Sequence, residues 1–164
     1  MVKMKKIIVL LSLLIVTGYC NAQYRIQKAR AFFTVSIGGM QRVDEHGNKI
    51  DPERFTGRFI YIECRYNGKP KVDSVFYNGI LFSASVADKE ETTNKIGIQK
   101  DNGKPVTWIP RKGNHIWKID LLQADGNTLP HKALKKIVVK GKLDKIKFSY
   151  IITSETELTT PDMY

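Results

Sequence analysis

Turn-forming residues that recur about every ten residues constrain the fold of this chain more than any other feature of its sequence. The runs between them are rich in β-branched and aromatic residues and lack the 3.6-residue apolar repeat of an amphipathic helix. This spacing is typical of short antiparallel strands, so we predict an all-β chain. The turn formers are Gly38-Gly39, His46-Gly47-Asn48, Asn67-Gly68, Asn78-Gly79, Asn102-Gly103, Gly113-Asn114, Asp125-Gly126 and Lys140-Gly141-Lys142.

The dipeptide Asn78-Gly79 gives the clearest local prediction. Asn and Gly both tolerate the positive φ of a type I′ turn, whose twist matches that of two antiparallel strands. We therefore expect a two-residue hairpin here, with strands at residues 72–77 and 80–86. Two further hairpins are expected: residues 58–66 returning through a turn at 67–70, and residues 134–140 joined to 143–153 at Gly141.

Alternation of apolar and polar residues assigns faces to these strands. Ile60, Ile62 and Cys64 share one face, and Arg58 stands in phase with them at the strand entrance. A second apolar row runs through residues 146–152. Each row needs a facing layer, and no crossover helices are expected between the strands. We predict one domain over residues 23–164, an antiparallel β-sandwich of about eight or nine strands, with a closed β-barrel as the alternative.

The first 22 residues have the pattern of a cleaved secretory signal, resembling the signals of exported bacterial proteins. Three lysines precede an apolar run at residues 7–16, which is too short to cross a bilayer as a helix. Cys20 and Ala22 supply the small side chains that signal peptidase needs if cleavage falls before Gln23. Export to the periplasm or the extracellular space is expected. The alternative is a lipid anchor on Cys20, although Tyr19 stands where lipoprotein signals carry a small residue.

The exported chain would be basic. Loss of residues 1–22 removes three lysines and no acid, which lowers the net charge from +11 to +8. Lysines are densest at residues 132–147, and strand phase places Lys136, Lys140, Lys145 and Lys147 opposite the apolar rows. These four form a candidate site for an anionic glycan, a lipid headgroup or an acidic protein. The alternative is that they only protect a sheet edge and maintain solubility.

Aromatic residues give a second candidate surface. Phe59 and Tyr61 share a face with Glu63 and Arg65, and Trp108 lies in a short segment bracketed by prolines. If exposed, these aromatic side chains would suit a sugar or a partner chain. If a second sheet covers them, they are core residues.

Enzyme and metal signatures are missing from the sequence. There is no Gly-x-Ser-x-Gly elbow, no phosphate-binding glycine loop, and no paired metal ligands around His46, His115 and His131. Glu90 with Glu91, and Glu155 with Glu157, lie in polar stretches expected to be solvated. Cys64 would be the sole cysteine after cleavage, in an apolar row, and we expect a small core residue rather than a nucleophile.

These patterns favour an exported, non-catalytic binding module with no cofactor, no metal and no membrane span. Its partner would be an acidic protein or an anionic glycan, and export argues against nucleic acid. The alternative is a small secreted enzyme with a site built from loops, acting on a glycan or small molecule.

Overall fold

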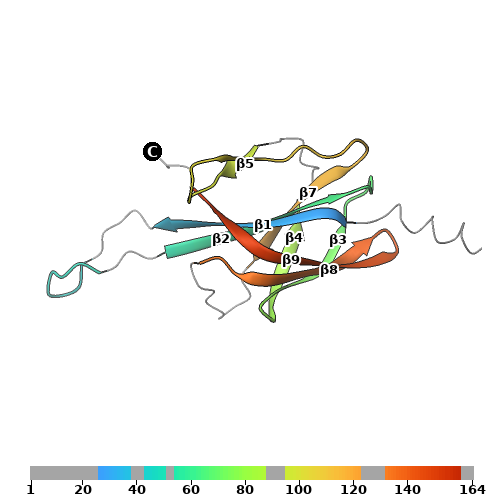
Figure 1. Ribbon diagram of the computed structural model, residues 1–164. Helices are drawn as coiled ribbons and strands as arrows, with labels where there is room; N and C mark the ends of the chain where they lie inside the picture. Colours follow the sequence, from blue (N-terminus) through green and yellow to red (C-terminus); the bar gives the residue numbers. More distant parts are fainter. Residues whose placement is uncertain (1–25, 38–42, 51–53, 88–94, 123–131, 160–164) are drawn as a thin grey trace, which may run out of the picture.

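The computed structural model describes residues 26–37, 43–50, 54–87, 95–122 and 132–159, and all regular structure within them is β-strand (Figure 1). The strands are β1 (Ile26–Ile37), β2 (Arg54–Cys64), β3 (Lys71–Tyr77), β4 (Ile80–Val86), β5 (Lys95–Ile98), β6 (Pro105–Thr107), β7 (His115–Leu122), β8 (Lys135–Leu143) and β9 (Ile146–Leu158). The predicted signal peptide, with Cys20, lies outside the described residues. Among those described, no helix is long and apolar enough to cross a membrane.

Seven strands close into a barrel in the order β1-β2-β7-β4-β3-β8-β9. Neighbours are antiparallel, except that β9 closes the barrel by pairing in parallel with β1. The all-β prediction is therefore confirmed, and the architecture is the closed barrel given as the alternative to the sandwich. Both arrangements bury one face of every strand, so alternation alone predicts them equally well.

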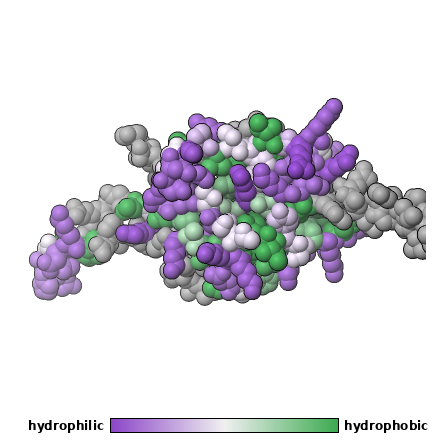
Figure 2. Space-filling model, in the orientation of Figure 1, coloured by the Kyte–Doolittle hydropathy of each residue, from purple (hydrophilic) through white to green (hydrophobic). Residues whose placement is uncertain are grey.

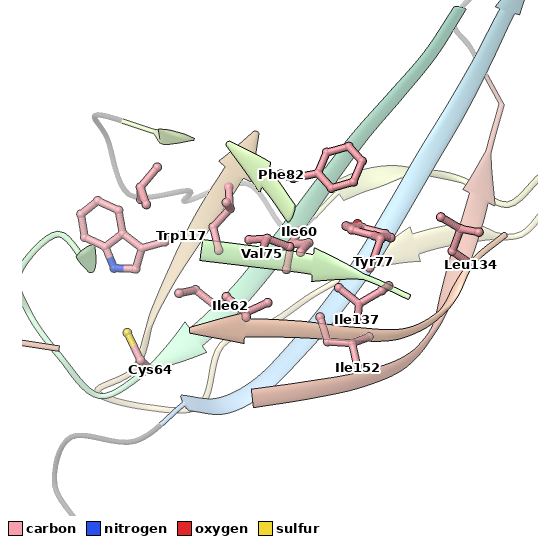
Figure 3. Packing of buried hydrophobic residues seen from close by; sticks show 14 of the residues in the cluster. Ile60, Ile62, Cys64, Val75, Tyr77, Phe82, Trp117, Leu134, Ile137 and Ile152 are labelled. Atoms are coloured by element: carbon pink, nitrogen blue, oxygen red, sulfur yellow. The ribbon is translucent and has the colours of Figure 1, made fainter. Parts of the chain in front are cut away.

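The barrel interior holds the main core (Figure 3). Ile60, Ile62 and Cys64 point inward from β2, as their alternation predicted, and meet Val75 and Tyr77 of β3. Cys64 is 0% exposed, which confirms the prediction that it is a buried core residue.

The hairpin at Asn78-Gly79 forms as predicted. Tyr77 pairs with Ile80, and both turn residues have positive φ, 48° and 89°. The hairpin expected at Gly141 also forms, but its turn lies at Asp144-Lys145.

Gly141 lies inside β8 instead of in the turn, directly opposite Phe148 of β9. A Cβ atom at Gly141 would stand 2.3 Å from the Lys71 carbonyl oxygen and 2.8 Å from the Phe148 ring. Close packing therefore requires a glycine here, and the prediction that Gly141 forms the turn was wrong.

The predicted pairing of residues 58–66 with the strand after Asn67-Gly68 was wrong. Strand β2 pairs with β1 and β7, whereas β3 pairs with β4 and β8. Strands β7 and β4 therefore stand between them in the barrel. Because β7 comes about fifty residues later in the sequence, no local pattern could reveal that it takes the place beside β2.

Strands β5 and β6 form a separate two-stranded sheet over the outside of the barrel (Figure 1). They cover part of the outer face of β1, β2 and β7, and a second core fills the space between. This core consists of Phe32, Tyr61, Val106, Trp108, Ile116 and Leu158, with Phe59 and Ile96 partly buried beside it.

Candidate functional site

The outer face of β3, β8 and β9 carries most of the lysines predicted as a site. Lys136, Lys140 and Lys147 are exposed there, as expected from strand phase. Lys145 is exposed too, but lies in the turn rather than on a strand. We call this outer surface, with its lysines, the lysine face.

A row of three lysines crosses the lysine face at one end. Lys71 of β3 pairs with Lys142 of β8, which pairs with Lys147 of β9. Side chains directly opposite each other in a sheet are only about 5 Å apart at Cβ, and like charges there are destabilising by a few tenths of a kcal/mol or more. Among the described residues, no acid forms an ion pair with any of the three. This row concentrates positive charge at a cost to the fold.

An exposed apolar row lies beside these lysines. Leu81 of β4, Phe76 of β3, Val138 of β8 and Ile151 of β9 are direct cross-strand neighbours. Leu81 is 53% exposed and Ile151 is 62% exposed. Figure 2 shows hydrophobic surface next to hydrophilic surface over the part of the barrel where Figure 1 places β8 and β9. The lysine face is thus a mixed surface, not a purely cationic one.

A groove of about 430 Å³ indents this surface at the middle of the apolar row. Phe76 and Val138 line it together with Lys136 and Lys140. The Lys140 ammonium lies 5.3 Å from the centre of the Phe76 ring, a cation–π distance that fixes the charge at the groove wall. The groove can take an apolar side chain of a partner while lysines meet acids around it.

The sequence identified only part of this surface. Lys71 was missed because the pairing of β3 with β8 joins residues about seventy positions apart. Lys142 was missed because the turn was expected at Gly141, which removes it from the strand. The exposed apolar row had no signal, because the cross-strand neighbours that form it come from four different strands.

The predicted aromatic surface is covered. Trp108 and Tyr61 are buried in the second core, and Phe59 is half-buried at its edge. The β5–β6 sheet therefore makes these residues core, which was the second of the two alternatives. Lys28 and Arg30 lie over the Trp108 ring at 4.8 Å and 5.7 Å.

Glu63, which the sequence placed on that surface, is buried and anchors the chain that follows β6. Its carboxylate accepts hydrogen bonds from Trp108 Nε1 at 2.8 Å, from the Arg111 backbone N–H at 2.9 Å and from Asn114 Nδ2 at 2.6 Å. Burial alone would raise the pKa of Glu63, but these three donors and the nearby Lys28 charge lower it below its usual value. Glu63 therefore serves as a structural anion.

A second buried carboxylate, Glu155, corrects the expectation that residues 155–157 are solvated. Glu155 forms an ion pair with Arg58 inside the barrel and accepts a hydrogen bond from the Leu134 backbone N–H at 3.0 Å. Arg58 also donates to the Lys132 carbonyl oxygen at 3.1 Å. Alternation correctly predicted that Arg58 lies on the inward face of β2. It missed Glu155 because two exposed residues separate Glu155 from buried Ile152.

Burial raises the pKa of the Glu155 carboxyl, although the Arg58 charge opposes the rise. Burial and the adjacent Glu155 carboxylate raise the pKa of the Tyr77 hydroxyl. The Arg58 guanidinium stacks 5.1 Å from the Phe33 ring and 5.6 Å from the Tyr77 ring. This cluster is enclosed by the barrel, so it supports the fold and does not face a ligand.

No metal-ligating cluster is gathered in the part of the chain that the structure describes. Asp44 accepts hydrogen bonds from the backbone N–H groups of His46 and Asn48, so residues 44–48 form the expected polar turn. His131 and the pair Glu90 and Glu91 lie outside the described residues.

No family model matches this chain, and no curated protein or solved structure matches it either.

Proposed function

We propose that this protein is an exported, non-catalytic interaction module that binds an acidic protein through the lysine face. The observation that carries the proposal is the Lys71–Lys142–Lys147 row, placed beside exposed apolar side chains. Like charges opposite each other destabilise a sheet, while a surface of one sign attracts partners of the opposite charge. The signal-peptide pattern at residues 1–22 supports export.

The mixed character of the face favours an acidic protein over the other anionic partners. A polyanionic glycan would engage the lysines and leave Leu81 and Ile151 exposed to water. A protein partner can cover the apolar row and place an anchor side chain in the 430 Å³ groove. Buried apolar contact then supplies affinity, and the lysines supply the rate and selectivity of association.

The groove on the lysine face fits binding better than it fits catalysis. An active site gathers titratable groups in one concavity. Among the described residues, the groove on the lysine face is lined by lysine, asparagine, glycine and apolar residues, without a carboxylate or imidazole.

The test is affinity capture from the exported proteins of the host, with three variants compared side by side. Lys142→Glu combined with Lys147→Glu reverses the charge of the row, and Ile151→Ser removes apolar contact without changing charge. Lys112→Glu is the matched control, since Lys112 is exposed and lies in the turn before β7. We expect one acidic protein that is lost with both face variants and retained with the control.

Direct binding assays with heparin oligosaccharide and with vesicles that carry anionic lipid test the two other partners, an anionic glycan and a lipid headgroup. A partner lost with the double lysine variant but retained with Ile151→Ser would indicate a polyanion recognised by charge alone. Equal capture by all variants would refute the lysine face as the site.

A further inference from the structure

The barrel is closed by only a short contact between its first and last strands. Pairing of β1 with β9 joins residues 31–34 to residues 155–158. The preceding residues of β1, 26–30, pair only with β2, and residues 146–154 of β9 pair only with β8, among the residues that the structure describes. Figure 1 shows the C-terminal end of β9 meeting the middle of β1, and the two strands separating toward their N-terminal ends. We call this boundary the β1–β9 seam.

The seam presents two unpaired strand edges. A strand inside a sheet directs alternate backbone N–H and C=O groups toward each of its two neighbours. Residues 26–30 and 146–154 therefore direct half of their backbone groups into the seam, where no described strand receives them. Such edges are templates for an additional strand. At about 3.3 Å per residue, residues 146–154 offer an edge roughly 30 Å long.

The interior side chains next to the seam are incompletely covered. Phe148 and Tyr150 of β9 face the barrel interior but are only half-buried. The interior residues of the neighbouring strand β8, such as Ile137 and Val139, are 0% exposed. A strand added beside β9 would cover the aromatic pair, so apolar burial would stabilise the addition.

A cleft of about 530 Å³ lies where the seam begins to open, beneath β6. Its walls carry small and hydroxyl side chains, which leave room for a main chain: Ala29, Ala31, Thr107, Thr153, Ser154 and Thr156. Arg30 and Lys104 also line it, whereas no acidic residue does among those described. The charge of the cleft therefore selects an anionic segment.

We infer that the β1–β9 seam is a second binding site, which takes an extended acidic segment of a partner protein as an added strand. Backbone hydrogen bonds to β1 and β9 hold the segment in place, and Arg30 and Lys104 contact its acidic side chains. The seam borders the lysine face along β9, but it binds through backbone edges and the cleft at Arg30 and Lys104, which are not part of that face, so the inference does not depend on the proposed function. Recognition through the main chain would allow several acidic sequences to bind.

The experiment uses a fluorescent octapeptide of alternating glutamate and valine, and the same peptide N-methylated at alternate residues. N-methylation keeps the charge but removes the N–H groups that a strand must donate. We expect the unmethylated peptide to bind and methylation to weaken binding by about tenfold or more. Hydrogen exchange should show new protection at residues 26–30 and 146–154.

Variants separate this site from the lysine face. Arg30→Glu combined with Lys104→Glu should weaken peptide binding by about tenfold, whereas Lys112→Glu and Lys142→Glu should each change it by less than about threefold. Three results would each overturn the inference: equal binding of both peptides, new protection confined to β3 and β8, or no binding below about 1 mM. None of these outcomes bears on capture of a partner by the lysine face.

Discussion

Replacing Arg58 by methionine tests the interior ion pair most directly. Arg58 and Glu155 are 3% and 0% exposed at their side chains, so removal of the guanidinium leaves a carboxylate enclosed by the barrel. Breaking a buried pair by removing one partner costs about 3–5 kcal/mol. A domain of this size is stable by about 5–15 kcal/mol, so the variant should lose a large fraction of its free energy of unfolding.

The cost should depend on pH in a defined direction. Burial already raises the pKa of Glu155 above its usual value of 4.5, and Arg58 opposes this rise. Without Arg58 the folded-state pKa rises further, so the folded state binds a proton that the unfolded state has released. Stability of the variant is therefore greatest below pH 4.5 and falls as the pH rises through the folded-state pKa, by about 1.4 kcal/mol per pH unit.

Urea denaturation at pH 4 and pH 8 measures both effects, and the m-value checks that the transition remains two-state. The informative control is Arg58→Met combined with Glu155→Gln, which removes both charges while an amide oxygen still accepts from the Leu134 N–H. We expect this double variant to recover most of the lost stability. If it is as unstable as the sum of its two single variants at pH 8, the two charges are not coupled and the reasoning is refuted.

Two further predictions concern the second buried carboxylate and the glycine in β8. Glu63→Gln should cost about 1–3 kcal/mol, because Glu63 accepts three hydrogen bonds, and should flatten the loss of stability with acid. Because the pKa of Glu63 is lowered, its charge stabilises the fold above pH 4.5, and this contribution is lost as the pH falls through the folded-state pKa. If Glu63→Gln unfolds in acid just as the parent does, Glu63 is not a structural anion. Gly141→Ala should cost about 1–3 kcal/mol because its Cβ would meet the Lys71 carbonyl oxygen. The control is Gly57→Ala, whose Cβ would meet only the Thr34 hydroxyl at 3.2 Å, and its stability should stay within about 0.5 kcal/mol of the parent. Equal falls in melting temperature for the two variants would show that the close approach at Gly141 does not determine stability.

The sequence predicted those features that depend on neighbours along the chain. The turn at Asn78-Gly79 follows from two residues that tolerate positive φ. The inward row of β2 follows from period-two alternation, which also placed Arg58 in phase with the core. The same alternation predicted that Lys136, Lys140 and Lys147 lie on an outer face, and the structure confirms that all three are exposed there.

Only the tertiary structure determined which strands lie side by side. Alternation fixes which face of a strand is buried but not which strand comes next to it, so β7 beside β2 and β9 beside β1 left no trace in the local pattern. The same limit hid the Lys71–Lys142–Lys147 row. It also hid the burial of Glu63 and Glu155, because a carboxylate is buried only where donors from distant segments meet it. Local chemistry therefore determined the strands and turns of this protein, and long-range pairing determined its surfaces.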